Sequence, residues 1–317
     1  MSIKALKCPH CLAPLPLSGG KAMVCRFCEH VLVDLPDLWW ARPVDVPAWA
    51  GRDEDRGKPR VGLSRHRYVL RQKLASGEAA DVYLARRDAR LSEQVVLKVA
   101  RGGAGSEGAK ALTREWRVLG RLSGSGANGS DYFSRLLPQP VAQGALRMEA
   151  GDSAYGVAYR WRSGFRHTLA GVRERHPRGV EPRVAVWMWK RMLEMLTWVH
   201  ASGFVHGAVR PEHCIVHPTE QGVVLVGWSR AQWRHGSKGA ASRPGEDIAA
   251  SARVIVRVLG GDAARLSSKV PAGLARLVLA QAEDAHHDAW EVREQLVLAA
   301  AEAFGPPAYT PFSMDEG

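Results

Sequence analysis

The sequence predicts an α+β protein in which one large domain follows one small domain, and three observations support this prediction. With 317 residues, of which 46% are hydrophobic and 24% charged, the chain is long and apolar enough to bury a large core. Four of its five cysteines lie within the first 28 residues. Beyond them, strand-like alternating segments come first and long apolar helical segments follow, an order typical of an α+β domain.

Composition and charge narrow the possible classes of protein. The most apolar stretch, residues 184–199, is interrupted by Lys190, Arg191 and Glu194, and we therefore expect no membrane span. Because cysteines stand where the core of a signal peptide would lie, we expect a cytoplasmic protein. The formal net charge of +12, from 44 basic and 32 acidic residues, permits a nucleic-acid partner but does not require one.

The cysteines near the start form two C-x2-C pairs, Cys8 with Cys11 and Cys25 with Cys28. Each pair can aim two thiolates at one point, so the two pairs predict a tetrahedral zinc site. Four thiolates leave no coordination position open, and the zinc would therefore be structural. Two disulfides, which need an oxidising compartment, and a redox C-x2-C are the alternatives. Residues 1–34 resemble a zinc ribbon of the rubredoxin-like kind, which implies docking to protein or nucleic acid.

Residues 35–65 are predicted to be a linker. The stretch is rich in proline, carries a charged cluster and has no sustained period of 2 or 3.6. Trp39, Trp40 and Trp49 are too hydrophobic for a free tether. We therefore expect a strap that lies on the surface of the next domain, with the tryptophans as anchors.

From Tyr68 the segments YVLRQKLASGEAADVYLARR and QVVLKVA alternate like paired strands. Their connection resembles the glycine-rich loop of protein kinases, whose pattern is G-x-G-x-x-G-x-V. The three glycine positions hold Ala75, Gly77 and Ala80, and Val82 follows them. Two extra methyl groups stiffen such a loop and project where a phosphate would lie.

The next segments carry a candidate ion pair. Lys98, on the predicted strand VVLK, resembles the lysine that holds nucleotide phosphates in kinases. Glu115 lies in the helical segment KALTREWRVLGRL, on the same face as Leu112, Leu119 and Leu122. A carboxylate on an apolar face is costly unless it is paired, so we expect Glu115 to bind Lys98. The alternative is that its side chain reaches solvent.

The segment from 183 to 200 predicts a helix that is apolar nearly all round and therefore buried. After it, FVHGAVRPEHCIVHP resembles the kinase catalytic loop H-R-D-L-K-P-E-N and the strand that follows. The frame is kept by His206, Pro211, Glu212 and Ile215. Cys214 is predicted to be a small buried hydrophobe.

The chemical groups of that loop are lost. By resemblance, Ala208 stands at the catalytic aspartate, Arg210 at the following lysine, His213 at the magnesium-binding asparagine, and Gly227 at the metal-binding aspartate of D-F-G. Magnesium prefers hard oxygen ligands, which none of these side chains supplies. Alanine can neither accept a proton nor orient the attacking hydroxyl. The sequence therefore predicts no catalytic residue.

The same resemblance implies that residues of the structural framework of a kinase are kept. Leu119, His206 and Trp228 fall where kinases stack a column of side chains that joins the two lobes. Asp247 matches the helix aspartate that accepts hydrogen bonds from backbone amides of the catalytic loop; alternatively it is an N-terminal helix residue favoured by the dipole. The resemblance also implies a vestigial nucleotide pocket, made of Gly77, Val82, Val96, Lys98, Glu115 and Ile215.

The rest of the chain predicts a reduced activation segment and a helical end. About seventeen residues separate Ser229 from Asp247, and no A-P-E motif occurs among them. Residues 271–304 predict two helices. The neighbouring His286 and His287 fall in their connector or in a first turn, and a solvated connector explains them better than a metal site.

Taken together, residues 66–305 resemble a protein-kinase domain, with a bilobal α+β fold of an antiparallel-sheet N-lobe and a helical C-lobe, before a tail at 306–317. This predicts an inactive bacterial pseudokinase, a scaffold or allosteric partner of a kinase, phosphatase or other component of a signalling or stress/defence system. Expected cofactors are structural zinc and either no ATP or magnesium-independent ATP. One alternative is an atypical nucleotide-binding phosphotransferase; another is a nucleic-acid-binding adaptor that uses the ribbon and the basic surface.

Overall fold

The computed structural model divides into two compact units. The first comprises Met1–Thr113 and Gln139–Ser163, and the second comprises Arg114–Pro138 and Gly164–Gly317, so the division falls within a helix, α1 (Glu107–Ser123). The structure describes residues 22–24, 31–34, 55–89, 91–148, 153–162, 164–233, 244–262, 265–284 and 288–314.

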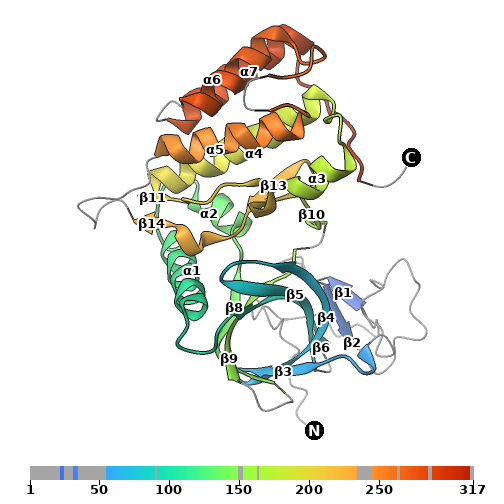
Figure 1. The fold of residues 1–317 in the computed structure, drawn as a ribbon, viewed down its shortest axis with the longest axis vertical. Coiled ribbons are helices and arrows are strands. Elements are labelled where there is room, and N and C mark those ends of the chain that lie inside the picture. Colours follow the sequence, from blue (N-terminus) through green and yellow to red (C-terminus); the bar gives the residue numbers. More distant parts are fainter. Residues whose placement is uncertain are drawn as a thin grey trace. The chain divides into compact units, whose positions relative to one another are not determined.

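A closed antiparallel barrel forms the main body of the first unit (Figure 1). Alternate residues of each strand point into it, and they form one core that includes Leu63, Tyr68, Leu97 and Leu146. The predicted paired strands after Tyr68 are confirmed. In barrel order the strands are β3 (Arg60–Leu63), β4 (His66–Ser76), β5 (Ala80–Arg87), β7 (Gln94–Ala100), β9 (Ser153–Arg160) and β8 (Pro140–Met148).

The range predicted as a linker ends in a barrel strand. β3 pairs with β4 and with β8, and it thereby closes the barrel. Just before it, the buried Asp55 carboxylate accepts a hydrogen bond from Arg86 Nε on β5 at 2.6 Å. The Arg86 guanidinium also donates to Ser92 Oγ at 2.8 Å. Residues from Asp55 onward are therefore fixed to the barrel by a buried ion pair. The predicted tryptophan anchors lie outside the described residues.

A small hairpin precedes the barrel in sequence. β1 (Ala22–Val24) pairs antiparallel with β2 (Val31–Asp34), with Val24 opposite Val31. β2 also pairs with β6 (Leu91–Ser92), and the three strands form one sheet. The apolar run Val31–Val33, which follows the second pair of cysteines, thus lies on a strand. All four predicted zinc ligands lie outside the described residues.

Helices dominate the second unit. α4 packs against α5 and α7, and α5 packs against α6, which gives the stack of long helices seen in Figure 1. The two predicted helices after residue 271 are confirmed, while His286 and His287 lie outside the described residues. The helices are α2 (Ser130–Phe133), α3 (Leu169–Arg175), α4 (Pro182–Ala201), α5 (Pro244–Val258), α6 (Ala272–Glu283) and α7 (Ala289–Phe304).

The centre of this unit is α4. Eleven of its residues are buried, among them Trp187, Trp189 and Trp198, so the prediction of a helix buried nearly all round is confirmed. Trp189 Nε1 donates to Ser251 Oγ on α5 at 3.0 Å, which satisfies its one polar atom. None of the helices in the described part of the chain has both the length and the apolar character that a bilayer span requires.

Short strands follow α4 and carry the segments that resemble kinase motifs. β12 (Cys214–His217) pairs with β10 (His167–Thr168) on one side and with β13 (Gly222–Leu225) on the other. β11 (Phe204–Val205) pairs with β14 (Gln232–Trp233). The segment that resembles a kinase catalytic loop therefore lies between β11 and β12. Residues 227–229 follow β13.

Candidate functional site

The loop between β4 and β5, which resembles a glycine-rich loop, is folded onto its own unit. The Gly77 N–H donates to the Ala80 carbonyl at 2.9 Å, and the Ala79 carbonyl accepts from the Arg101 N–H at 3.0 Å. Ala79 also approaches the start of α1, since a Cβ added to Gly108 would lie 2.3 Å from the Ala79 oxygen. The Gly77 amide therefore serves the loop itself, whereas in an active kinase such amides close over phosphates.

A charged cluster joins this loop to its neighbours. Asp81, at the start of β5, accepts from Lys73 Nζ at 2.9 Å and from Arg101 Nη2 at 2.8 Å. The hydrogen bond from Lys73, and then that from Arg101, lowers the pKa of Asp81 to about 2. The three side chains are partly exposed, so the cluster orients the strands but contributes little to stability.

One face of the barrel wall carries the predicted pocket residues of the first unit. Val82 lies opposite Lys98, and Val96 lies opposite Tyr159. Directly paired residues share a face, and the alternate residues Leu97 and Ala158 point into the barrel. Val82, Val96 and Lys98 therefore lie together on the outer face. The Lys98 ammonium stands 5.4 Å from the centre of the Tyr159 ring, a cation–π contact.

Glu115 is buried on α1 with the apolar residues predicted to share its face. Its side chain is 1% exposed, and Leu112, Leu119 and Leu122 are all buried. The alternative in which Glu115 reaches solvent is therefore wrong. Lys98 belongs to the first unit and Glu115 to the second, so their ion pair stays a prediction.

In the second unit, the segment that resembles a catalytic loop is held by Asp247. The His206 and Gly207 backbone N–H groups donate to its two carboxylate oxygens at 2.7 and 2.8 Å, and His200 Nε2 lies 3.1 Å from one of them. The predicted hydrogen bonds from loop amides to Asp247 are therefore confirmed. Burial alone would raise its pKa, but the His200 hydrogen bond, the nearby His206 and His200 rings, and the His206 amide together lower the pKa of Asp247.

His206 links this loop to the segment after β13. Its Nε2 donates to the Val226 carbonyl at 3.1 Å, and its Nδ1 accepts from the Ala208 N–H at 3.2 Å. Both roles belong to a neutral imidazole, and burial lowers the pKa of His206 accordingly. The His206 and Trp228 rings lie 4.4 Å apart, and both side chains are fully buried, as is Leu119. All three predicted column residues thus lie in the core of the second unit.

The two positions that resemble magnesium ligands meet in one contact. Gly227 has a φ of 80°, in the left-handed region, and a Cβ added there would lie 2.6 Å from the His213 ring. His213 Nδ1 donates to the Ala208 carbonyl at 2.8 Å, while the Arg210 guanidinium donates to Nε2 at 3.0 and 3.2 Å. A hydrogen-bonded imidazole therefore fills the space beside Gly227 where a longer side chain would lie.

Ile215 and Cys214, the remaining predicted positions, lie on β12. Ile215 lies half-buried on β12, opposite Val224 and Thr168. Cys214 is fully buried, and burial raises the pKa of its thiol, as expected of an inert small hydrophobe. Across the described part of the chain, no three His, Cys, Asp or Glu residues cluster in a way that could hold a metal ion.

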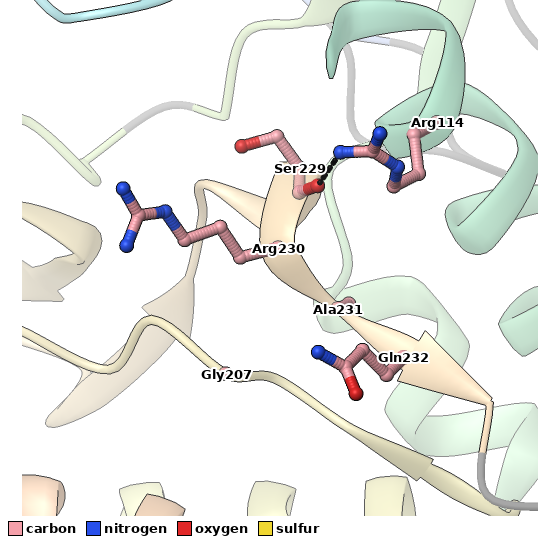
Figure 2. Close-up of a pocket in the computed structure, with 6 residues that line it drawn as sticks. All are labelled: Arg114, Gly207, Ser229, Arg230, Ala231 and Gln232. Carbon is pink, nitrogen blue, oxygen red and sulfur yellow. Dashed lines mark hydrogen bonds between the residues drawn. The ribbon is translucent and has the colours of Figure 1, made fainter. Parts of the chain in front are cut away.

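A hollow of about 340 Å³ lies beside the segment that resembles a catalytic loop, and the sequence analysis did not predict it. Arg114 Nη1 donates to the Ser229 carbonyl at 3.1 Å across it. Figure 2 shows the Arg114 and Arg230 guanidinium groups on opposite sides of the segment 229–232, so they do not converge on one ligand. Scattered arginines carry no pattern that could have predicted this hollow. Its lining residues are Arg114, Gly207, Ser229, Arg230, Ala231 and Gln232.

Comparison with known proteins bears on the fold. No protein family and no curated protein matches the sequence. A solved structure described as the crystal structure of the BubR1 kinase domain is similar, with a TM-score of 0.57 and 12% sequence identity. The match covers 77% of this chain and 83% of that one. At this identity the likeness concerns the fold alone, and the chain therefore has a mixed α and β fold similar to that of a protein kinase domain.

Proposed function

We propose that this protein is a pseudokinase, which transfers no phosphate and acts as a protein-binding scaffold or allosteric partner. The observation that carries the proposal is the contact between His213 and Gly227. Phosphoryl transfer needs a divalent metal beside the triphosphate and a carboxylate that orients the attacking hydroxyl. At the corresponding positions this chain has an imidazole, a glycine and, at Ala208, a methyl group.

The hydrogen bonds of His213 support the same proposal. Because Nδ1 donates to Ala208 and Nε2 accepts from Arg210, both nitrogens are engaged and no lone pair is left to bind a metal. The Arg210 guanidinium adds a positive charge at this place, which would repel a divalent cation. Metal binding would therefore require His213 to leave its present partners.

The intact framework around this place supports a binding role. Asp247, His206 and Trp228 are buried and make the hydrogen bonds and ring contacts described above. A rigid unit without a working metal site is suited to present surfaces to a partner. We propose that the partner is a kinase, a phosphatase or another component of a bacterial cytoplasmic signalling or stress/defence system.

Phosphate transfer from radiolabelled ATP to generic protein substrates tests the proposal. With magnesium or manganese, we expect the wild-type chain to transfer no more phosphate than its Lys98→Ala variant. Melting temperatures measured with ATP should also be the same in magnesium and in EDTA. Turnover that requires Lys98, or a magnesium-dependent rise in melting temperature, would contradict the proposal and favour the atypical phosphotransferase.

We also propose that the four cysteines hold a structural zinc ion. The spacing of the cysteines supports this, because each of the two C-x2-C pairs can aim two thiolates at one point. We expect the purified protein to contain one zinc per chain by mass spectrometry of the native state. Replacing Cys8 and Cys11 by Ser should remove it, whereas Cys214→Ser should not. Equal zinc content in the two variants would contradict the site.

A further inference from the structure

The segment after α7 follows a defined path along the second unit. Gly305, with a φ of 77°, ends the helix, and residues 306–314 continue without regular secondary structure. Figure 1 shows this red segment passing beside α3. We call residues 305–314 the tail segment. We call the surface that it contacts, formed by Thr219, Gln221, His176 and Trp187, the groove.

The turn between β12 and β13 forms one end of this groove. Tyr309 Oη donates to the Thr219 carbonyl at 3.1 Å, and Gln221 Nε2 donates to the Thr310 carbonyl at 2.8 Å. One of these bonds holds a side chain of the tail segment and the other holds its backbone. An extended peptide of any sequence can accept the hydrogen bond from Gln221, whereas the hydrogen bond to the Thr219 carbonyl selects a tyrosine.

The other end of the groove is aromatic. The Phe312 ring lies 5.5 Å from the His176 ring, just after α3, and 6.3 Å from the Trp187 ring on α4. Tyr309 and Phe312 are thus two anchors three positions apart, and Pro311 between them favours an extended backbone. Aromatic anchors in a preformed groove are a recurrent mode of peptide recognition.

Residues outside the tail segment hold both ends of the groove in place. Arg191 Nε donates to the Gln221 carbonyl at 3.2 Å, and Gln221 itself has a positive φ of 50°. At the other end, Arg173 Nη1 donates to the His176 carbonyl at 3.3 Å. An arginine of α4 therefore holds Gln221 and an arginine of α3 holds His176, and neither arginine belongs to the tail segment.

The tail segment is an imperfect occupant. Tyr309 is 61% exposed. His176 Nε2 and Trp187 Nε1 are buried, and neither has a hydrogen-bond partner among the described residues. A buried polar atom without a partner costs free energy, and the Phe312 ring offers nothing to accept a hydrogen bond. A peptide with a hydrogen-bond acceptor beside its second aromatic side chain would fit the groove better.

We propose that this groove is a docking site for an extended segment of a partner protein, with aromatic side chains three positions apart and a proline just before the second. The tail segment is its displaceable internal occupant. This proposal rests on the proposed scaffold function, to which it adds a binding site. Its test does not involve phosphate transfer. Because the tail segment is tethered, its effective concentration is high, and a partner must compete with it.

Peptide binding tests the groove directly. The probe is a fluorescein-labelled peptide with the sequence of residues 306–314, followed by fluorescence anisotropy. We expect binding at least ten-fold tighter to a chain without residues 305–317, and to the full chain with Tyr309→Ala and Phe312→Ala, than to wild type. In the shortened chain, Gln221→Gly, which permits the positive φ, should weaken binding several-fold. Gln295→Ala, exposed on α7, is the control and should not.

Three results would overturn the proposal. The first is a shortened chain and a doubly substituted full chain that are both folded by circular dichroism but do not bind the probe. The second is equal binding of a probe in which the two aromatic residues are alanine. The third is a concentration-dependent wild-type dimer that dissociates when the tail segment is removed, since a second copy would then occupy the groove.

Discussion

Replacement of Asp247 by alanine is expected to lower the free energy of unfolding by about 3–5 kcal/mol. This is the usual cost of removing one partner from a buried charged network. The carboxylate is 2% exposed and accepts from the His206 and Gly207 amides. Its removal leaves both buried N–H groups without an acceptor, at a cost of about 1–3 kcal/mol each. Urea unfolding monitored by circular dichroism measures the change.

Matched variants separate this effect from a general loss of charge. Asp247→Asn keeps one oxygen acceptor and should lose clearly less stability than Asp247→Ala. Glu302→Ala, exposed near the end of α7, should change the free energy of unfolding by less than about 0.5 kcal/mol. A loss below about 1 kcal/mol in Asp247→Ala would show that the loop does not depend on this carboxylate.

The same variant has a defined pH dependence. Because the pKa of Asp247 is lower in the folded state than its ordinary value of 3.8, its stabilising contribution is complete above that pH. The contribution is lost as the pH falls through the folded pKa. The difference between wild type and Asp247→Ala should therefore be constant near neutral pH and shrink below about pH 4.

Replacement of Gly227 by aspartate should destabilise the protein and should not create a magnesium site. A residue with a Cβ in the left-handed region costs about 1–2 kcal/mol. The new Cβ would also lie 2.6 Å from the His213 ring and would displace it from the Ala208 carbonyl, at about 1 kcal/mol for the lost hydrogen bond. We therefore expect a loss of about 2–4 kcal/mol in urea unfolding.

A double-mutant cycle isolates the steric part of this effect. In a His213→Ala background the ring is absent, so Gly227→Asp should cost only the backbone strain. A coupling of about 1 kcal/mol or more between the two positions is expected. Identical costs in the two backgrounds would show that the imidazole does not occupy the space beside Gly227. Melting temperatures of Gly227→Asp should not respond to magnesium.

Much of the second unit could be predicted from sequence because its signals are local. The burial of Leu112, Leu119 and Leu122 follows from helical periodicity, and that of α4 from a helix apolar on every side. The bonds to Asp247 were predicted by resemblance, since a short motif kept its order along the chain. In the first two cases residues near one another in sequence carry the information, whereas Asp247 was matched to a distant loop only through the order of the motifs.

Other features were not predictable because they join distant segments. β3 lies in the range predicted as a linker, and only its pairing with β8, more than eighty residues away, makes it part of the barrel. Arg86 could not be matched to Asp55 by any pattern, since scattered arginines offer many possible partners. The contact of Phe312 with Trp187 likewise joins the tail segment to a helix far from it in sequence.

The sequence by itself determined which chemical groups stand at positions 208, 213 and 227, because the type of a side chain does not depend on the fold. It thereby showed that oxygen ligands are missing there. Only the tertiary structure decided that the His213 ring fills the space beside Gly227 and that the tail segment fills a groove next to α3. Packing is the reason: what occupies a space depends on the three-dimensional meeting of segments, which no local pattern records.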